Sequence, residues 1–236
     1  MERGRGRPDG PPDPGLRGMR QRVRASSAAT RTQTRTLAAH ADDVVGGLLG
    51  EIPLPARPHG RPAVAMLMGY PGVGKTHCAR LLAARLGAAH VASDQLRSRL
   101  FLAASYADAE NAAVFRIVDA LVERLLDEGH RVIVDATNLR ARGRASIESV
   151  ARGRAAPCAH ILVTSDEADV LARLAARRQA RAAHDRSDAD ERIYRAMRER
   201  GFEPPEGPLI TVRNGADLAG EIERAASELE ARWPAS

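Results

Sequence analysis

Residues 69–76 read GYPGVGKT, which matches the phosphate-binding pattern G-x-x-x-x-G-K-[ST] at every fixed position. The apolar run AVAMLM, at 63–68, comes directly before this stretch and has the composition of a buried strand. An alanine- and leucine-rich segment follows it as far as Leu86, where Gly87 is expected to end a helix. A glycine-rich loop between a strand and a helix is the setting in which this pattern binds phosphate. The stretch therefore predicts a phosphate-binding loop in an α/β protein.

The residue types of this loop fit the chemistry of phosphate binding. Backbone N–H groups must converge on phosphate oxygens, and glycine serves where a Cβ would clash or where φ is positive. The start of the following helix adds its positive end. We expect Lys75 to reach the β- and γ-phosphates of ATP, the Thr76 hydroxyl to ligate Mg²⁺, and the His77 N–H to face phosphate. The other residues expected around the nucleotide are Gly69, Tyr70, Pro71, Gly72, Val73 and Gly74.

Lys75 is the only lysine in the chain, whereas the other 35 basic residues are arginines. An ammonium is a compact charge that fits inside a loop closed around phosphate, and a planar guanidinium is wider. The absence of a second lysine also excludes the guanine-reading N-K-x-D motif of GTP-binding switch proteins that resemble Ras. In the run VIVDA, Ala136 follows Asp135, so the glutamate with which many ATPases activate water is missing. Transfer of phosphate to an acceptor other than water is therefore favoured.

Five short apolar runs alternate along the chain with segments of helical periodicity. Alternating strands and helices predict a parallel sheet that is covered by helices on both faces, with right-handed crossovers. The expected strands are 63–68, 89–93, 131–136, 158–164 and 209–214. The expected helices run to Leu86, from Gln95, over 108–128 and 141–152, from Glu167, and over 188–201 and 217–232.

The N-terminal part differs in composition from the rest of the chain. Residues 1–36 are rich in Gly, Pro, Arg, Ser and Thr without apolar periodicity. We interpret them as a disordered basic arm, with an organelle transit peptide as the alternative. Residues 37–62 are expected to form a short helix and a proline-rich linker, and residues 63–236 the α/β domain. Nine arginines and three acidic residues in the arm account for the net charge of +6. Nonspecific contact with nucleic acid is therefore expected of the arm.

The two cysteines, Cys78 and Cys158, lie far apart and form neither a CxxC pair nor a cluster with histidine at metal-binding spacing. We expect two free thiols in a reducing compartment. No run approaches ~18 consecutive apolar residues, and the N-terminus lacks the apolar region of a secretory signal. These features predict a cytoplasmic protein that does not enter a membrane.

Two aspartates come at the ends of expected strands. Asp94 follows the strand at 89–93, and Asp135 lies near the end of the strand at 131–136. Because ligands bind beyond the carboxyl ends of the strands in open α/β sheets, we expect both beside the phosphate loop. Asp94 is the candidate that orients an acceptor hydroxyl and takes its proton, and its alternative role is to cap the following helix. Asp135 is expected either to contact Mg²⁺ through water or to make structural hydrogen bonds. Arg97, one helical turn after Asp94, is the candidate that holds the acceptor or its phosphate.

An arginine-rich segment follows the fourth expected strand. LARLAARRQAR, at 171–181, contains Arg173, Arg177, Arg178 and Arg181, and a polar stretch comes directly after it. This pattern predicts a lid that closes over ATP and brings positive charge to the transferring phosphate. The alternative is a helix face that is simply exposed to solvent.

Four motifs in this order carry a resemblance to a known family. They are GYPGVGKT, SDQLR at 93–97, VIVDATNLRARGR at 132–144, and SDADERIYRAMRERGFEPPEG at 187–207. Together they resemble P-loop kinases related to the kinase domain of polynucleotide kinase and, more distantly, zeta-toxin-type and small-molecule kinases. The resemblance spans about 63–215 and implies a three-layer sandwich whose five parallel strands lie in the order 2-3-1-4-5. Two features depart from it: the chain has no phosphatase or ligase domain, and its 62-residue N-terminal extension has no counterpart.

The resemblance also implies roles for single residues. Lys75 and Thr76 would bind ATP and Mg²⁺, and Asp94 would be the general base, supported by Arg97. Asp135 would lie near this pair, and the lid arginine would be Arg177 or Arg173.

The sequence thus predicts an ATP-dependent kinase that phosphorylates a hydroxyl, either at a polynucleotide 5′ end or on a small molecule. One alternative is a nucleic-acid-binding protein whose ATP site acts as a switch and whose arm does the binding. Another is a toxin-like kinase of a nucleotide sugar. The neutral composition of the chain after residue 36 disfavours a long polynucleotide track. Five arginines could still form a local basic patch: Arg140, Arg142, Arg144, Arg152 and Arg154.

Overall fold

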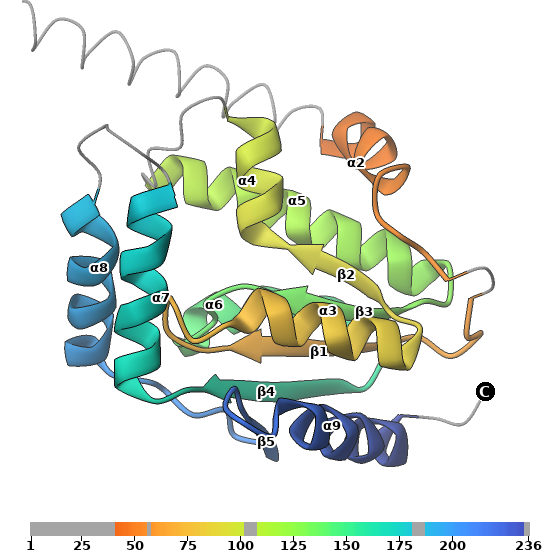
Figure 1. Cartoon of the computed structure of the whole chain (residues 1–236). Helices are drawn as coiled ribbons and strands as arrows, with labels where there is room; N and C mark the ends of the chain where they lie inside the picture. Colours follow the sequence, from red (N-terminus) through yellow and green to blue (C-terminus); the bar gives the residue numbers. More distant parts are fainter. Residues whose placement is uncertain (1–40, 56–57, 102–107, 181–186, 234–236) are drawn as a thin grey trace, which may run out of the picture.

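A five-stranded parallel sheet forms the centre of the structure, and its strands lie in the order β2-β3-β1-β4-β5 (Figure 1). The computed structural model describes residues 41–55, 58–101, 108–180 and 187–233 of the 236-residue chain. The strands are β1 (Ala63–Met68), β2 (Ala89–Ala92), β3 (Arg131–Asp135), β4 (Cys158–Thr164) and β5 (Leu209–Arg213). Each pair of neighbouring strands is parallel. The fold class expected from the sequence and the strand order implied by the family resemblance are both confirmed.

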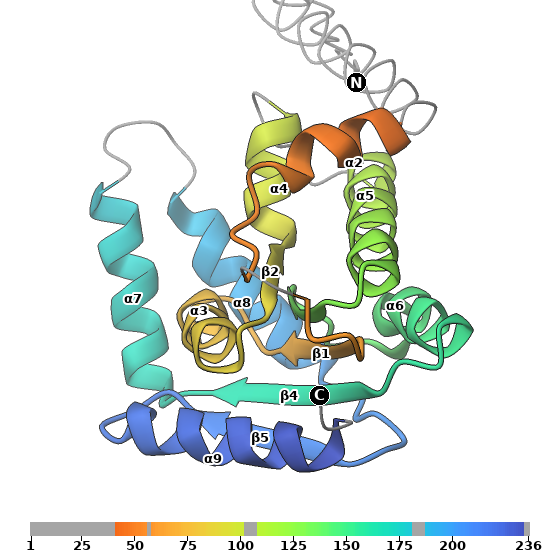
Figure 2. The same ribbon diagram turned by 90° about the vertical axis from the view of Figure 1, so that its right-hand side faces the viewer.

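Helices cover both faces of the sheet. In the described part of the chain they are α2 (Ala41–Leu49), α3 (Lys75–Leu86), α4 (Ser93–Leu100), α5 (Asp108–Asp127), α6 (Ala141–Gly153), α7 (Glu167–Ala180), α8 (Ser187–Arg200) and α9 (Leu218–Arg232). Helices α3 and α9 lie on one face, and α5 and α6 lie on the other (Figures 1 and 2). The long α5 also carries α2 on its outer side.

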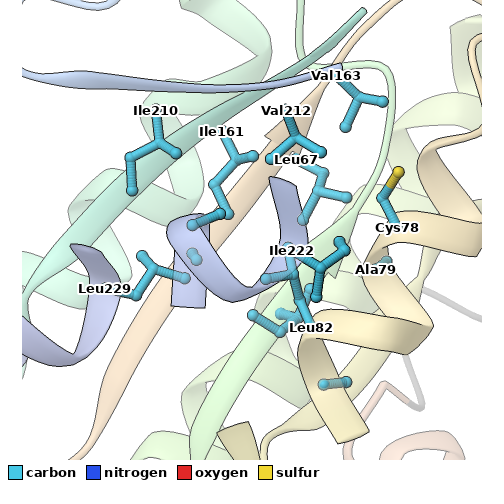
Figure 3. Packing of buried hydrophobic residues seen from close by; sticks show 14 of the residues in the cluster. Leu67, Cys78, Ala79, Leu82, Ile161, Val163, Ile210, Val212, Ile222 and Leu229 are labelled. Atoms are coloured by element: carbon cyan, nitrogen blue, oxygen red, sulfur yellow. The ribbon is translucent and has the colours of Figure 1, made fainter. Parts of the chain in front are cut away.

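The central strand β1 is buried on both faces, as its uninterrupted apolar run predicted. Its side chains alternate, so that Leu67 belongs to the buried cluster that contains Leu82 of α3 and Ile222 of α9 (Figure 3). Met66 points the opposite way, into the cluster that contains Leu121 of α5. This two-sided burial fixes the position of the loop that leaves the carboxyl end of β1.

Most helix and strand bounds lie close to those expected, and one difference matters for the site. Strand β2 ends at Ala92 and α4 begins at Ser93, so that Asp94 lies inside the first turn of the helix. As expected, α3 ends at Gly87, which adopts φ 60° and whose N–H donates a hydrogen bond to the carbonyl of Ala83.

The N-terminal regions inferred from the sequence are described only in part. The helix expected within 37–50 is seen as α2, and residues 50–55 continue it without a further helix or strand. The arm at 1–36 lies outside the described residues. Among the helices that the structure describes, none has both the length and the apolar character that a membrane span needs.

Candidate active site

The sheet topology gathers three sequence motifs at one edge. Strands β2, β3 and β1 are neighbours, and their carboxyl ends lead to Asp94, to Asp135 and to the glycine-rich loop. In the sheet register, Asp135 is paired with Leu67 of β1 and with Ala92 of β2. The segments that the sequence predicted to converge therefore lie at the carboxyl ends of adjacent strands.

Two glycines of the loop stand where no other residue fits. Gly72 has φ 83°, and a Cβ there would lie 2.9 Å from Val170 Cγ1 of α7. Gly74 has φ 93°, and a Cβ there would overlap the side-chain amide of Asn214. Positive φ is strained for residues with a Cβ. The loop is thus shaped both by its own backbone and by the close approach of α7 and of the residue after β5.

Lys75, the first residue of α3, lies at the centre of the site. Its Nζ donates a hydrogen bond to the carbonyl of Tyr70, 3.1 Å away, so that the side chain folds back over the loop. Burial lowers the pKa of its ammonium, and the nearby carboxylates of Asp135 and Asp94 oppose this effect. The ammonium and both predicted carboxylates are therefore close enough to interact.

Asp135, the last residue of β3, is only 5% exposed. Burial alone would raise the pKa of its carboxyl, but the nearby side chains of His90 and Thr76 and the charge of Lys75 hold this pKa below its ordinary value. His90 Nε2 lies 3.5 Å from Asp135 Oδ2. The carboxyl is thus ionised at neutral pH beside the Thr76 hydroxyl. Hard oxygen donors of this kind fit Mg²⁺, which keeps several of its waters in nucleotide sites.

Asp94 is exposed in the first turn of α4. The residue that caps this helix is Ala92, and no side chain makes the capping hydrogen bond. The alternative interpretation of Asp94 as a helix cap therefore has no support in the geometry. Its carboxylate acts instead on the ammonium of Lys75.

Arg97 faces away from this group. Its side chain is buried, and its guanidinium donates to Glu110 Oε1 at 2.6 Å and to Asn111 Oδ1 at 2.8 Å. Both partners belong to α5, so that Arg97 joins α4 to α5. The structure does not bring it beside Lys75 or Asp135, and its role toward an acceptor stays a prediction.

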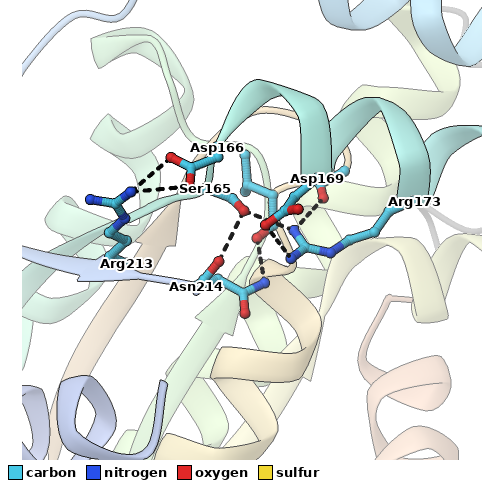
Figure 4. A network of polar contacts seen from close by, with 8 residues as sticks. Ser165, Asp166, Asp169, Arg173, Arg213 and Asn214 are labelled. Atoms are coloured by element: carbon cyan, nitrogen blue, oxygen red, sulfur yellow. Dashed lines mark hydrogen bonds and ion pairs between the residues drawn. The ribbon is translucent and has the colours of Figure 1, made fainter. Parts of the chain in front are cut away.

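The two lid candidates occupy different positions. Arg173 of α7 donates to the Ser165 hydroxyl at 3.0 Å and to the carbonyl of Gly72 at 3.4 Å, and it pairs with Asp169 at 3.7 Å (Figure 4). It is therefore anchored on the phosphate loop. Arg177 is exposed one turn further along, and its charge is near enough to contribute to the lowered pKa of Lys75. The side chain of Arg178 and residues 181–186 lie outside the described part.

Sequence reasoning missed Asn214, which comes directly after β5. Its side-chain amide donates to the carbonyl of Val73 at 2.8 Å, and its main-chain carbonyl accepts from the Ser165 hydroxyl (Figure 4). The side chain is buried, and it closes the loop from the side opposite β3. A polar residue that follows a buried strand at the edge where the loop lies was the signal that could have found it.

Sequence reasoning also missed a contact between α8 and the loop. The ring of Tyr194 meets that of Tyr70 edge-on, with centroids 6.1 Å apart. The guanidinium of Arg198 lies over both rings, at 5.7 Å and 5.8 Å from their centroids, and donates to the Tyr194 hydroxyl. These contacts place α8 against the phosphate loop.

A family model described as an AAA domain matches residues 64–205, which is more than half of the chain. The chain belongs to this AAA domain family. The matched part of the AAA domain begins in β1 and includes the phosphate loop, α4 and the Arg-rich α7. Among curated proteins, no significant match is found.

Solved structures share the fold of this AAA domain. The Mycobacterium tuberculosis APS kinase CysC, in complex with AMPPNP and APS, is 22% identical, with a TM-score of 0.56; the match covers 72% of this chain and 98% of that one. Chaetomium thermophilum Kti12, in complex with ADP-AlF3, is 21% identical with a TM-score of 0.57, over 72% of this chain and 99% of that one. A Chloroflexus aurantiacus structure described as a putative kinase is 20% identical with a TM-score of 0.57, over 73% and 98%. The chain thus has a P-loop kinase-like fold, whereas the narrower resemblance to polynucleotide kinase and zeta-toxin-type kinases stays a prediction.

Proposed function

We propose that this protein is an ATP-dependent kinase that transfers the γ-phosphate of ATP to a hydroxyl group of its acceptor. The observation that carries the proposal is the convergence of Lys75, the Thr76–Asp135 pair and the exposed Asp94 on one glycine-rich loop. Support also comes from the AAA domain match and from the kinases that share the fold. Ala136, in place of a water-activating glutamate, favours an acceptor other than water.

Each side chain has a part in the proposed transfer. Lys75 leaves the carbonyl of Tyr70 and binds the β- and γ-phosphates. Asp94 orients the acceptor hydroxyl and takes its proton while the acceptor oxygen bonds to the γ-phosphorus. The bond from that phosphorus to the β–γ bridging oxygen breaks, and ADP leaves. Thr76, with Asp135 acting through water, would hold Mg²⁺, which would neutralise charge on the phosphates. Arg177 adds positive charge from α7.

Of the two acceptor classes expected from the sequence, we propose the small molecule. Three of the five arginines that were candidates for a basic patch are paired or buried, whereas Arg142 and Arg152 are exposed. Arg140 pairs with Glu203 at 2.6 Å, Arg154 pairs with Asp127 at 2.6 Å, and Arg144 is buried. A track for a polynucleotide needs positive charges that are available to phosphates.

The test is a transfer assay with γ-labelled ATP that compares oligonucleotides bearing a 5′-hydroxyl with a panel of small metabolites. We expect label in a small metabolite. In Asp94→Asn, we expect unchanged affinity for AMPPNP and a kcat lower by about 10²–10⁴-fold, because the proton acceptor is lost. Transfer to oligonucleotides alone would contradict the small acceptor, and an unchanged kcat in Asp94→Asn would contradict the role of Asp94.

A further inference from the structure

A cavity of about 510 Å³ lies beside β2, one of the two edge strands of the sheet, and no residue of the phosphate loop lines it. Its walls come from α3, β2, α4 and the chain from Leu48 to Pro55, in which Glu51 pairs with Arg99 of α4. The segment 48–55 precedes the AAA domain match at 64–205. The cavity is therefore built partly by chain that the family match does not include, and it is separate from the candidate nucleotide site.

The walls of this cavity are mostly apolar. Leu48, Ile52 and Leu54 contribute from the N-terminal segment, and Val91 and Leu96 contribute from β2 and α4. Ala83 and Ala84 of α3 have small side chains, which keep the cavity open, and Leu54 is 38% exposed. Pockets for small organic ligands have about 300–1,000 Å³ and combine apolar walls with a few polar groups. The volume and the walls fit an apolar body of the size of two fused aromatic rings or a medium alkyl chain.

The polar groups of the cavity are predominantly cationic. Arg80 of α3 lines it, and its guanidinium makes no hydrogen bond or ion pair within the described part of the chain. Arg99 of α4 lines it too, paired with Glu51 across from it. Gln95 adds a side-chain amide. With one acid against two arginines, the lining carries a net positive charge that a single anionic group would balance.

We propose that this cavity is a binding site for an amphipathic organic anion, whose apolar body lies on the walls and whose anionic group meets Arg80. The cavity is separate from the candidate active site, and one residue of its lining, His90, links the two. His90 lines the cavity, and its Nε2 lies 3.5 Å from Asp135 Oδ2, while Gln95 follows Asp94 in sequence. A ligand that shifts His90 or α4 changes the affinity for nucleotide, and nucleotide changes the affinity for the ligand by the same factor.

Binding of anilinonaphthalene sulfonate, an amphipathic anion that fluoresces in apolar sites, tests the proposal on the full-length protein. We expect one saturable site, and we expect decanoate to displace the probe. Ala84→Phe fills the cavity from an exposed position of α3, and Ala112→Phe places the same ring on an exposed position of α5. Arg80→Gln removes the free cation, and Arg116→Gln removes an exposed arginine of α5.

The expected result is a loss of probe affinity of at least about tenfold in Ala84→Phe and of about fivefold in Arg80→Gln, with both α5 controls unchanged. Saturating the protein with Mg²⁺ and AMPPNP should change the dissociation constant of the probe severalfold without abolishing binding. Wild-type affinity in Ala84→Phe, or complete displacement of the probe by AMPPNP, would overturn the proposal. Because these readouts are binding constants, they hold or fail independently of the proposed phosphotransfer.

Discussion

Lys75 is the only basic residue of the chain that is not an arginine, and the surroundings of its ammonium suit a lysine. The half-buried side chain donates to the loop carbonyl of Tyr70, and the carboxylates of Asp94 and Asp135 are near enough to act on its charge. We predict that Lys75→Arg lowers the kcat for phosphate transfer at least about 100-fold, because a guanidinium is too wide for this position and its donors point differently. The matched change at an exposed site, Arg152→Lys, should leave kcat unchanged. Initial rates with γ-labelled ATP measure both, and a fully active Lys75→Arg would contradict this reading of the lysine.

The buried carboxyl of Asp135 leads to a prediction about how the stability of the fold depends on pH. The pKa of its carboxyl in the folded protein lies below the ordinary value of 3.8. The ionised group therefore stabilises the fold fully above the unfolded-state pKa, and this contribution disappears as pH falls through the folded-state pKa. Chemical unfolding without nucleotide or Mg²⁺ should show Asp135→Asn to be less stable than the wild type at pH 7, and the difference should shrink below about pH 4. A difference that is constant with pH would mean that the charge contributes nothing.

The sequence indicated which residues belong to the candidate site better than it indicated which side chains surround them. The motifs that contain Lys75, Thr76 and Asp135 predict what these residues contact, because binding of phosphate and Mg²⁺ requires an ammonium, a hydroxyl and a carboxylate there. Asn214 and Tyr194 touch the loop from more than 100 residues away in the chain, and nothing local to them announces the contact.

Helices α4 and α5 are held together by a residue to which the sequence analysis gave a functional role. The SDQLR motif presented Arg97 as an acceptor ligand, but its guanidinium lies between α4 and α5 on Glu110, which is fully buried. We predict that Glu110→Ala lowers the free energy of unfolding by about 3–5 kcal/mol, because it leaves a buried charge without its main partner. The exposed pair of Glu123 with Arg154 is the control, and Glu123→Ala should cost at most about 1 kcal/mol. Thermal or urea unfolding distinguishes the two cases.

The elements themselves were largely predictable, since apolar runs and glycine stops define them locally. The start of α4 was not, because Ser93 and Asp94 can end a strand or begin a helix with equal ease. The docking of α8 through Tyr194 and Arg198 depends on a partner ring in the phosphate loop, and helical periodicity carries no information about such a partner.

On the scale of the whole molecule, charge separates the N-terminal arm from the rest of the chain. Residues 1–36 account for the net charge of +6, and every described element lies after them. We predict that a chain lacking residues 1–36 keeps kcat and the affinity for AMPPNP within about twofold and loses salt-sensitive binding to nucleic acid. Fluorescence anisotropy with a labelled oligonucleotide at low and high salt measures that binding. Loss of catalysis on removal of the arm would instead favour a protein that depends on the arm for its function.

The most direct measurement is the transfer of label from γ-labelled ATP, with ADP and labelled acceptor quantified together in the wild type and in Lys75→Ala. A kinase gives one labelled acceptor for each ADP formed, and Lys75→Ala gives neither above background. Formation of ADP with the label released only as inorganic phosphate, or wild-type turnover in Lys75→Ala, would contradict phosphate transfer at this loop.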